Sequence, residues 1–366
     1  MLADSSTIAD IIRQFSLVEG SSYTYKAYGS GHINDTFLVR ANQDEAYLLQ
    51  RINHQVYPDV AGMMDNIRRV TEHLRQKLEE RHESTLTTLQ IIPTQGGALF
   101  YQDDDGNFWR MLTYIDNSVA YDVATSPDLA REAGRAFGQF QALLRDLPGP
   151  PLHEVIPDFH HMGKRLQQFK QALTTDTAQR VASVPGEIKF VHERAEKMQA
   201  LYQLVDDGTL PLRVTHNDTK LNNVLLDPVN HRARCVVDLD TVMPGSVLYD
   251  FGDAIRTTAN TAAEDEVDLD KVQFSLSYYE AFTQGYYSET RTFLTDAEIE
   301  NLPLSAQYMT FIMGLRMLTD YLAGDVYYKI HHPEHNLQRA RAQFQLVKRM
   351  EEKHEEMIRS VQKLVC

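Results

Sequence analysis

The chain has 366 residues, of which 43% are hydrophobic and 24% are charged, an ordinary composition for a globular protein. Acidic residues outnumber basic residues by 51 to 36, and the net charge of −15 argues against a nucleic-acid-binding surface, which needs a basic face. No apolar stretch approaches the roughly 20 residues of a membrane span, so no membrane partner is expected. The two cysteines, Cys235 and Cys366, form neither a disulfide framework nor a CxxC metal site, which fits a cytoplasmic location.

The first third of the chain is predicted to be strand-rich, after a short amphipathic helix within residues 2–17. Runs of Tyr, Thr, Val and Leu between glycine-rich or polar turns predict the strands. These strands are Ser22–Tyr28, Thr36–Arg40, Ala46–Ile52, Leu86–Pro93, Leu99–Tyr101 and Phe108–Ile115. Between them, apolar residues on one face predict a helix over Asp59–Arg81, and Asp103–Asn107 is predicted to be a hairpin turn.

Beyond about Asn117 the pattern becomes helical, with one β-like segment at Arg213–Asp240. The predicted helices are Pro127–Leu144, Pro157–Leu173, Lys189–Leu204, Asp268–Tyr287, Asp296–Ala323 and Asn336–Leu364. We therefore expect a small β-rich lobe, residues 1–115, and a large helical lobe, residues 116–366. The sequence leaves open whether the helical insert at 157–204 shapes a pocket or only packs.

The chemistry is concentrated in residues 215–226. Asp218 and Asn223 are five residues apart, the H-x-D-x-x-x-x-N spacing of a kinase catalytic loop. In such a loop the Asp orients the attacking hydroxyl and accepts its proton, and the Asn oxygen binds Mg²⁺. Asp238 follows fifteen residues after Asn223 at the end of an apolar strand, where a carboxylate can bridge Mg²⁺ to nucleotide phosphates. Asp240 is expected either to bind the metal and phosphates together with Asp238 or only to support the loop.

The stretch HNDTKLNNVLLD, followed by VVDLDTVMPGSVLYDFGDAIR, resembles the aminoglycoside phosphotransferase and choline kinase superfamily. Tyr249-Asp250 matches the element that buttresses the site in that superfamily. The resemblance implies an α+β, two-lobed protein-kinase-like fold, ATP as co-substrate, Mg²⁺ as cofactor and a small-molecule hydroxyl as acceptor. Two features differ from protein kinases: no APE segment follows, and the second acid motif reads Asp238-Leu239-Asp240 in place of DFG.

Four further segments resemble a narrower group, the N-acetylhexosamine 1-kinase-like proteins: Gly29–Thr36, Leu48–Asn53, Gly314–Leu322 and His335–Arg341. That group phosphorylates the anomeric hydroxyl of N-acetylglucosamine or N-acetylgalactosamine, and the resemblance extends from about residue 20 to about residue 350. It implies that a sugar is the acceptor. The candidate acceptor-binding residues are His32, Asn34, Asp35, Arg316, Asp320 and Tyr327. The plainer alternatives are solvated turn residues and, for Arg316 and Asp320, a surface ion pair at i, i+4.

The nucleotide is expected to contact the turn that contains Gly29 and Gly31, although an ordinary hairpin turn remains the alternative. Alternation along the third strand turns one residue of the pair Gln50-Arg51 inward. Only Arg51 is charged, so it is favoured as the cation for the phosphates, without excluding Gln50.

The acidic partner of that cation is predicted on the following helix, at Asp65 or Glu72. The backbone between Thr113 and Ile115 is predicted to bind adenine as a kinase hinge does. Trp109 is expected in the core or near the nucleotide.

His216 is predicted to hold the loop by hydrogen bonding, and the pairs His160-His161 and His331-His332 are predicted to be surface or loop residues. A cationic acceptor would need several acids or aromatic walls around it, whereas His32, Asn34 and Arg316 form a mixed set that suits a neutral sugar. Two alternatives stay open. One is a kinase of choline, homoserine, an aminoglycoside or a methylthio-sugar, and the other is a catalytically silent nucleotide-binding protein.

Overall fold

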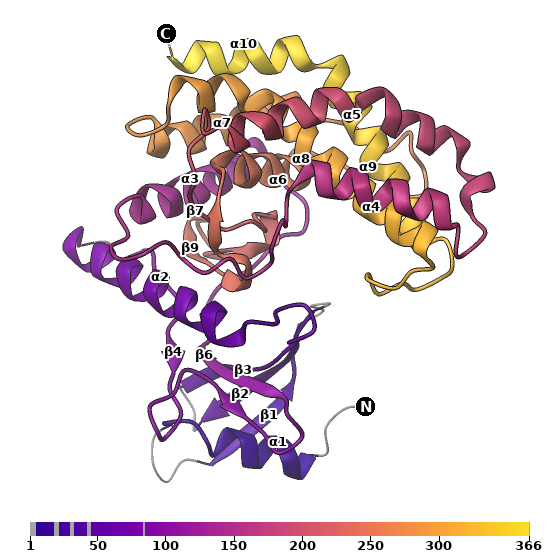
Figure 1. Ribbon diagram of the computed structural model, residues 1–366. Coiled ribbons are helices and arrows are strands. Elements are labelled where there is room, and N and C mark those ends of the chain that lie inside the picture. The colour runs from indigo at the N-terminus through magenta and orange to yellow at the C-terminus, as the bar shows by residue number, and fades with distance from the viewer. Residues whose placement is uncertain (1–4, 18–21, 30–32, 42–44, 83–84, 366) are drawn as a thin grey trace. The chain divides into compact units, whose positions relative to one another are not determined.

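The computed structural model describes residues 5–17, 22–29, 33–41, 45–82 and 85–365 (Figure 1). The chain divides into two compact units, each made of several segments. The first contains Met1–Val119, Asp146–Pro157 and Leu225–Met243, and the second contains Ala120–Arg145, Asp158–Val224 and Pro244–Cys366. Two later segments therefore return to the N-terminal unit, whereas the sequence predicted one boundary between residues 115 and 116.

The first unit is built on an antiparallel sheet with the strand order β1-β2-β3-β6-β4, and β5 also pairs with β6. The strands are β1 (Tyr23–Ala27), β2 (Asp35–Ala41), β3 (Glu45–Ile52), β4 (Ile91–Ile92), β5 (Tyr101–Gln102) and β6 (Phe108–Thr113). All lie within predicted strands or within two residues of them. The predicted strand over Leu86–Pro93 is wrong in length, because Thr87 donates its N–H to the Arg234 carbonyl at 2.7 Å instead of extending the sheet.

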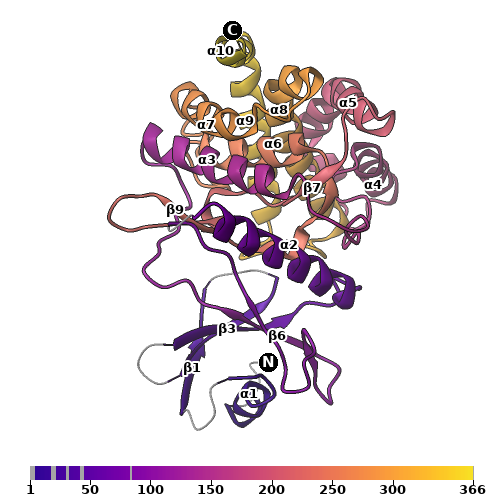
Figure 2. The same ribbon diagram turned by 90° about the vertical axis from the view of Figure 1, so that its left-hand side faces the viewer.

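One face of this sheet is covered by the N-terminal helix α1 (Ser5–Ile12) (Figure 2). Ile8, Ile12 and Phe15 pack there against sheet residues that include Leu49 and Met111. Trp109 belongs to the same cluster and is 1% exposed, which confirms its predicted place in the core. Burial of this apolar face is what holds the short α1 in place.

The register of the strands divides their side chains between two faces, because successive residues of a strand point to opposite sides. Leu49 lies between Phe37 and Met111, on the face of α1. Gln50 lies between Thr36 and Arg110, on the other face.

Helix α2 (Val60–Glu80) follows β3 and precedes β4, with bounds that agree with the predicted helix. The Asp59 side chain caps its start by accepting a hydrogen bond from the Gly62 N–H at 2.9 Å. Buried Asn66 ties both returning segments to the helix, because it donates to the carbonyls of His153 at 2.8 Å and Val242 at 2.9 Å. The second returning segment contains the strand β9 (Ala233–Val236), which pairs with β8 (Val224–Leu226).

The second unit is mainly helical and also carries the strand pair β7 (Arg213–Thr215) and β10 (Met243–Gly245). Its helices are α3 (Pro127–Leu144), α4 (Met162–Thr175), α5 (Pro185–Asp206), α6 (Val247–Thr258), α7 (Leu276–Thr290), α8 (Asp296–Ala323), α9 (His335–Glu352) and α10 (His354–Val365). The predicted bounds of α3 and α8 agree with the structure. The prediction placed the starts of α4 and α7 too early and made α5 too short.

Helices α3 and α7 pack side by side at glycines (Figures 1 and 2). A Cβ on Gly285 would lie 2.0 Å from the Arg131 carbonyl oxygen, and one on Gly134 would lie 2.1 Å from that of Phe282. Only glycine allows the two backbones to approach this closely.

Two helix predictions were wrong. Helix α6 was missed, although Ser246 caps it and Leu248, Phe251 and Ile255 give it a helical apolar pattern. The single helix expected over Asn336–Leu364 is divided at Lys353 into α9 and α10. The sequence has no glycine or proline at this break, and the helical spacing of apolar residues continues across it. The pattern therefore predicted a single helix.

None of the helices that the structure describes combines the length and the apolar run needed to span a bilayer. Cys235 is buried with a free thiol, and Cys366 lies outside the described residues.

Candidate active site

The predicted catalytic loop lies in the second unit, between β7 and the short helical turn Leu221–Asn223. The backbone turns sharply at Asn217, whose φ of 63° lies in the left-handed region. Asp250, from the first turn of α6, holds this turn by accepting hydrogen bonds from the N–H groups of His216 at 2.8 Å and Asn217 at 2.7 Å. This is the buttressing position that the resemblance assigned to Tyr249-Asp250.

Asp218 projects from the held loop and is only partly buried. Lys220 Nζ lies 2.7 Å from its Oδ2, and the Asn223 side-chain nitrogen lies 3.2 Å from the same oxygen. Burial acts to raise the pKa of Asp218, but the charge and hydrogen bond of Lys220 outweigh it, so the pKa lies below its ordinary value. The carboxylate is therefore ionised at neutral pH and can accept a proton.

His216 and Asn223 support this carboxylate from within the loop. The His216 ring is buried and its Nδ1 accepts the Asp218 N–H at 3.3 Å, as expected of a loop-fixing residue. The Asn223 nitrogen donates to the Asp218 carbonyl at 2.7 Å, which leaves the Asn223 oxygen as its atom for a metal. Neighbouring Asn222 instead donates to Asp122 at 2.8 Å, which supports the predicted register of the loop.

The predicted metal and phosphate acids, Asp238 and Asp240, belong to the first unit. Asp238 has φ 63° and ψ 55°, a left-handed conformation that is uncommon for a residue other than glycine and is often found at functional sites. Asp240 is 2% exposed and forms an ion pair with Arg110 at 2.5 Å, and it accepts a hydrogen bond from Asn34 at 2.7 Å.

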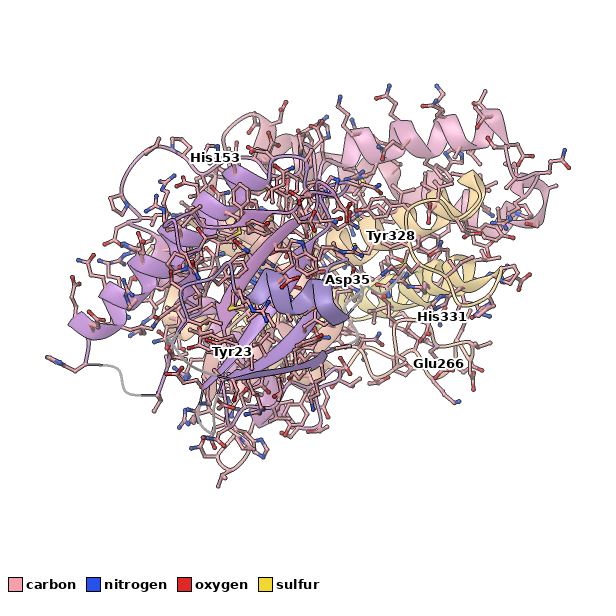
Figure 3. The ribbon with its side chains drawn as sticks, turned by 90° about the horizontal axis from the view of Figure 1, so that it is seen from below. Tyr23, Asp35, His153, Glu266, Tyr328 and His331 are labelled. Carbon is pink, nitrogen blue, oxygen red and sulfur yellow. The ribbon has the colours of Figure 1, made fainter. Side chains whose placement is uncertain are left out.

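The cation that the structure places beside Asp240 is Arg110 of β6, not Arg51. Alternation sends Arg51 to the face of α1, where it pairs with Asp35 (labelled in Figure 3). Gln50 points the other way and accepts from Arg110 Nε at 2.9 Å. Sequence reasoning missed Arg110 because its position depends on the pairing of β3 with β6, strands that lie far apart in the chain.

The acidic partners predicted on α2 are both engaged elsewhere. Asp65 and Glu72 pair with Arg68, at 2.7 Å and 2.9 Å, on the surface of the helix. Neither is therefore the partner of Arg51 or of Arg110.

The predicted adenine segment is partly occupied by the sheet. The Thr113 N–H donates to Gln90 at 2.9 Å and the Tyr114 N–H donates to Ala46 at 3.1 Å, so a donor for adenine falls to Ile115. In the predicted phosphate turn, Gly29 has φ 75°, a conformation that suits glycine. Gly31 and His32 lie outside the described residues.

Two of the predicted acceptor-binding residues hold the structure together. Asn34 is engaged at both ends, with Asp240 and with the Asn53 N–H at 3.0 Å. The Asp320 carboxylate does not pair with Arg316 but accepts the N–H groups of three successive residues after α8, at 2.8–3.0 Å. It fixes the loop that carries Tyr327 and Tyr328.

Arg316 lies in the second unit among aromatic rings. Its guanidinium carbon is 5.0 Å from the Phe159 ring centre, 5.7 Å from that of Tyr327 and 5.8 Å from that of Tyr328. No carboxylate of the described residues lies within ion-pair distance of it, so its charge is available to a ligand. The role of Arg316 and Tyr327 at the acceptor stays a prediction.

The two histidine pairs differ. His331 and His332 are exposed on the loop after α8, as predicted (His331 is labelled in Figure 3). His160 also lies in a turn but is buried, 6% exposed, with Nε2 3.2 Å from the Asn217 carbonyl of the catalytic loop. The Phe-His-His pattern gave no signal of this contact, which joins residues 57 positions apart.

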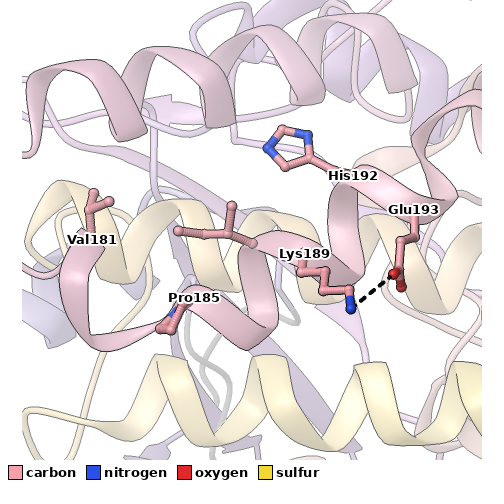
Figure 4. Close-up of a pocket in the computed structure, with 6 residues that line it drawn as sticks. Val181, Pro185, Lys189, His192 and Glu193 are labelled. Carbon is pink, nitrogen blue, oxygen red and sulfur yellow. Dashed lines mark ion pairs between the residues drawn. The ribbon is translucent and has the colours of Figure 1, made fainter.

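A pocket of about 710 Å³ opens on the helical insert, at the start of α5 (Figure 4). It is lined by Val181, Pro185, Ile188, Lys189, His192 and Glu193, none of which is a predicted site residue. Lys189 and Glu193 pair across one side of it at 3.7 Å.

The titration of Asp250 predicts the acid limb of the pH profile. Burial raises the pKa of Asp250 to about 6, although the loop N–H groups and Gln141 act against it. We expect kcat to fall below pH about 6, because a protonated Asp250 cannot accept both N–H groups. Stability follows the opposite sign: the raised pKa favours the folded state at low pH, and this contribution is lost as pH rises through about 6.

The measurement is kcat between pH 5 and pH 8 for the wild type and for Gln141→Met. The variant removes a hydrogen-bond donor to Asp250, so its acid limb is expected at higher pH. A limb that Gln141→Met does not move would assign the titration to another group.

Three features define a kinase-like phosphotransferase. The buried carboxylate of Asp250 holds a sharp turn, and the ionised Asp218 lies beside Lys220 and Asn223. The β-rich unit contains the buried pair of Arg110 and Asp240. Residues 24–286, which are most of the chain, match the phosphotransferase enzyme family. The protein therefore belongs to this family. It is thus a small-molecule phosphotransferase with ATP as phosphoryl donor, as the sequence predicted.

Several solved structures have a fold similar to that of this protein. A microcompartment-associated aminopropanol kinase has a TM-score of 0.65 at 16% identity, over 97% of this chain and 99% of that one. A spectinomycin phosphotransferase in complex with ADP and spectinomycin has a TM-score of 0.59 at 12% identity, over the whole of both chains. An ethanolamine kinase from Plasmodium vivax has a TM-score of 0.54 at 12% identity, over 88% of this chain and 82% of that one. These likenesses confirm the predicted α+β protein-kinase-like fold.

Proposed function

We propose that this protein transfers the γ-phosphoryl group of ATP to the anomeric hydroxyl of an N-acetylhexosamine, giving a sugar 1-phosphate and ADP. The observation that carries the choice of acceptor is Arg316, a cation held by aromatic rings without a carboxylate partner among the described residues. A charged amine acceptor would be repelled by this guanidinium, whereas the hydroxyl and amide oxygens of a neutral sugar accept hydrogen bonds from it.

Asp218 is proposed to orient the acceptor hydroxyl and to receive its proton as the oxygen bonds to the γ-phosphorus and the bond to ADP breaks. An anomeric hydroxyl is more acidic than an ordinary alcohol, so a carboxylate of low pKa suffices as the base. Lys220, 2.7 Å from Asp218, stabilises the ionised form before the reaction.

The nucleotide is proposed to be bound mainly by residues 1–115, and the acceptor by residues 116–366. Asn223 and Asp238 are the proposed Mg²⁺ ligands, since amide and carboxylate oxygens suit this ion, which offsets phosphate charge when bound. Asp240 is proposed to support them through Arg110 and Asn34. Gly29 and Gly31 would cover the phosphates, and Ile115 would bind adenine.

The function is tested by ADP release with Mg²⁺ and ATP over a panel of N-acetylglucosamine, N-acetylgalactosamine, glucose, choline, homoserine and an aminoglycoside. Turnover of the N-acetylhexosamines, with phosphate on the anomeric carbon of the product by NMR, is the expected result. Turnover of an amine alone would overturn the proposed acceptor and keep the family. Binding of ATP without turnover of any acceptor would favour a silent nucleotide-binding protein.

A further inference from the structure

Helix α6 contacts the catalytic loop at a second place, on the C-terminal side of Asp218 in the chain. The Leu221 N–H donates to Oγ1 of Thr257, near the end of α6, at 3.1 Å. Leu221 begins the short helical turn that carries Asn223. Asp250 accepts hydrogen bonds from the loop before Asp218, and Thr257 accepts one after it. Both sides of the proposed base are therefore tied to one helix.

The spacing of these two contacts follows from helix geometry. Thr257 comes seven residues after Asp250, which is close to two turns, so both side chains lie on the same face of α6. Their separation along the helix axis is about 10 Å. Thr219, between the two ends of the loop, donates its hydroxyl to the Asp250 carbonyl at 2.5 Å. One face of α6 therefore holds the loop at several points.

The Leu221 N–H needs this acceptor, because the first N–H groups of a helical turn have no partner within the turn. Leu221 is 1% exposed, so solvent is not available to it. The position before it, where Ser, Thr, Asp or Asn often caps a turn, holds Lys220, whose ammonium group cannot accept a hydrogen bond. Lys220 Nζ instead lies 2.7 Å from Asp218 Oδ2. Thr257 therefore supplies from α6 the cap that Lys220 cannot provide.

Thr257 and the end of α6 are themselves fixed. The Thr257 hydroxyl donates to the Ala254 carbonyl at 3.2 Å, which leaves its oxygen to accept from the loop. The adjacent residue, Arg256, is 5% exposed and pairs with Glu264 at 2.9 Å. Glu264 also accepts from Arg339 of α9 at 3.1 Å. The last turn of α6 is thus held from a second helix, which gives Thr257 a defined position.

We propose that Thr257 is a positioning residue for phosphoryl transfer: by accepting the Leu221 N–H, it fixes the segment that sets the proposed base, Asp218, relative to Asn223. This inference rests on the proposed function, but it holds for whichever small molecule is the acceptor. Thr257 acts through the loop and not on the substrate. A shift of about 1 Å in a reacting group can lower the rate about 100-fold, so its loss is expected in kcat rather than in KM.

The test compares Thr257→Val and Thr257→Ser with the wild type. Valine has the shape of threonine without the hydroxyl, so Thr257→Val leaves the Leu221 N–H without its acceptor. We expect kcat to fall about 10- to 100-fold at saturating ATP and acceptor, with each KM changed by no more than about 3-fold. Thr257→Ser keeps the hydroxyl, and its kcat is expected within about 3-fold of the wild type.

Thr258→Val is the matched control, because it makes the same change at the next residue of α6. Thr258 is buried, and its hydroxyl has no hydrogen-bond partner in the described part of the chain. Its kcat is expected to equal that of the wild type. Loss of activity in Thr258→Val or Thr257→Ser equal to that in Thr257→Val would overturn the role of the Thr257 hydroxyl.

Amide hydrogen exchange gives the readout that a merely structural role would not move. In Thr257→Val the Leu221 amide is expected to exchange at least about tenfold faster, while the amides of α6 keep their protection. An unchanged kcat, an unchanged Leu221 exchange rate, or exchange that rises equally across α6 would overturn the positioning role and leave the proposed function standing. Absence of turnover by the wild type with every acceptor of the panel would overturn the proposed function, and with it this inference.

Discussion

Asp218→Asn is expected to lower kcat by roughly 10²–10⁴-fold while leaving the affinity for ATP nearly unchanged. The asparagine side chain is close in shape to the carboxylate and can keep the contact with Asn223, but it cannot accept a proton from the acceptor. The charge partner of Lys220 is lost as well. The measurement is ADP release at saturating ATP and acceptor, with nucleotide binding by calorimetry.

Asn222→Ala is the matched control for this variant, because Asn222 lies on the same loop but turns to Asp122. It is expected to keep kcat within a few-fold of the wild type. If Asp218→Asn retained a tenth or more of the activity, the acceptor proton would have to leave by another route, and the base role of Asp218 would be wrong.

Arg110→Met is expected to destabilise the protein by about 3–5 kcal/mol, because it leaves the buried carboxylate of Asp240 without its cation. Both side chains are 2% exposed, so water cannot take the place of the guanidinium. The measurement is the free energy of unfolding in urea.

The matched control is Arg51→Met on the neighbouring strand. Arg51 also pairs with an Asp, but that pair is exposed, and a loss of no more than about 1 kcal/mol is expected. Adding Asp240→Asn to Arg110→Met should recover part of the loss, because the unpaired charge is then removed. Equal destabilisation by the two arginine variants would contradict the assignment of Arg110 as the buried cation.

The elements that the sequence predicted best have strong local signals. Helix α3 begins at a proline after a capping serine, and α8 begins with a capping box at Thr295 and Glu298. The strand predicted over Leu86–Pro93 failed because the outcome depends on a contact distant in sequence: Thr87 leaves the expected strand to bond Arg234. The break between α9 and α10 at Lys353 has no helix-breaking residue, so the sequence pattern did not predict it.

By itself the sequence determined the family and the position of the predicted catalytic loop, because His216, Asp218 and Asn223 lie within a few residues of one another and their spacing is read directly. Only the tertiary structure decided which side chains pack against that loop and, within the first unit, which cation pairs with Asp240. The pairing of β3 with β6 places Arg110, rather than Arg51, beside Asp240. The packing of residues 158–165 against the loop buries His160 beside Asn217 and sets Arg165 near Arg316. These contacts join residues that lie from 57 to more than 150 positions apart, so the local spacing of residues in the sequence does not predict them.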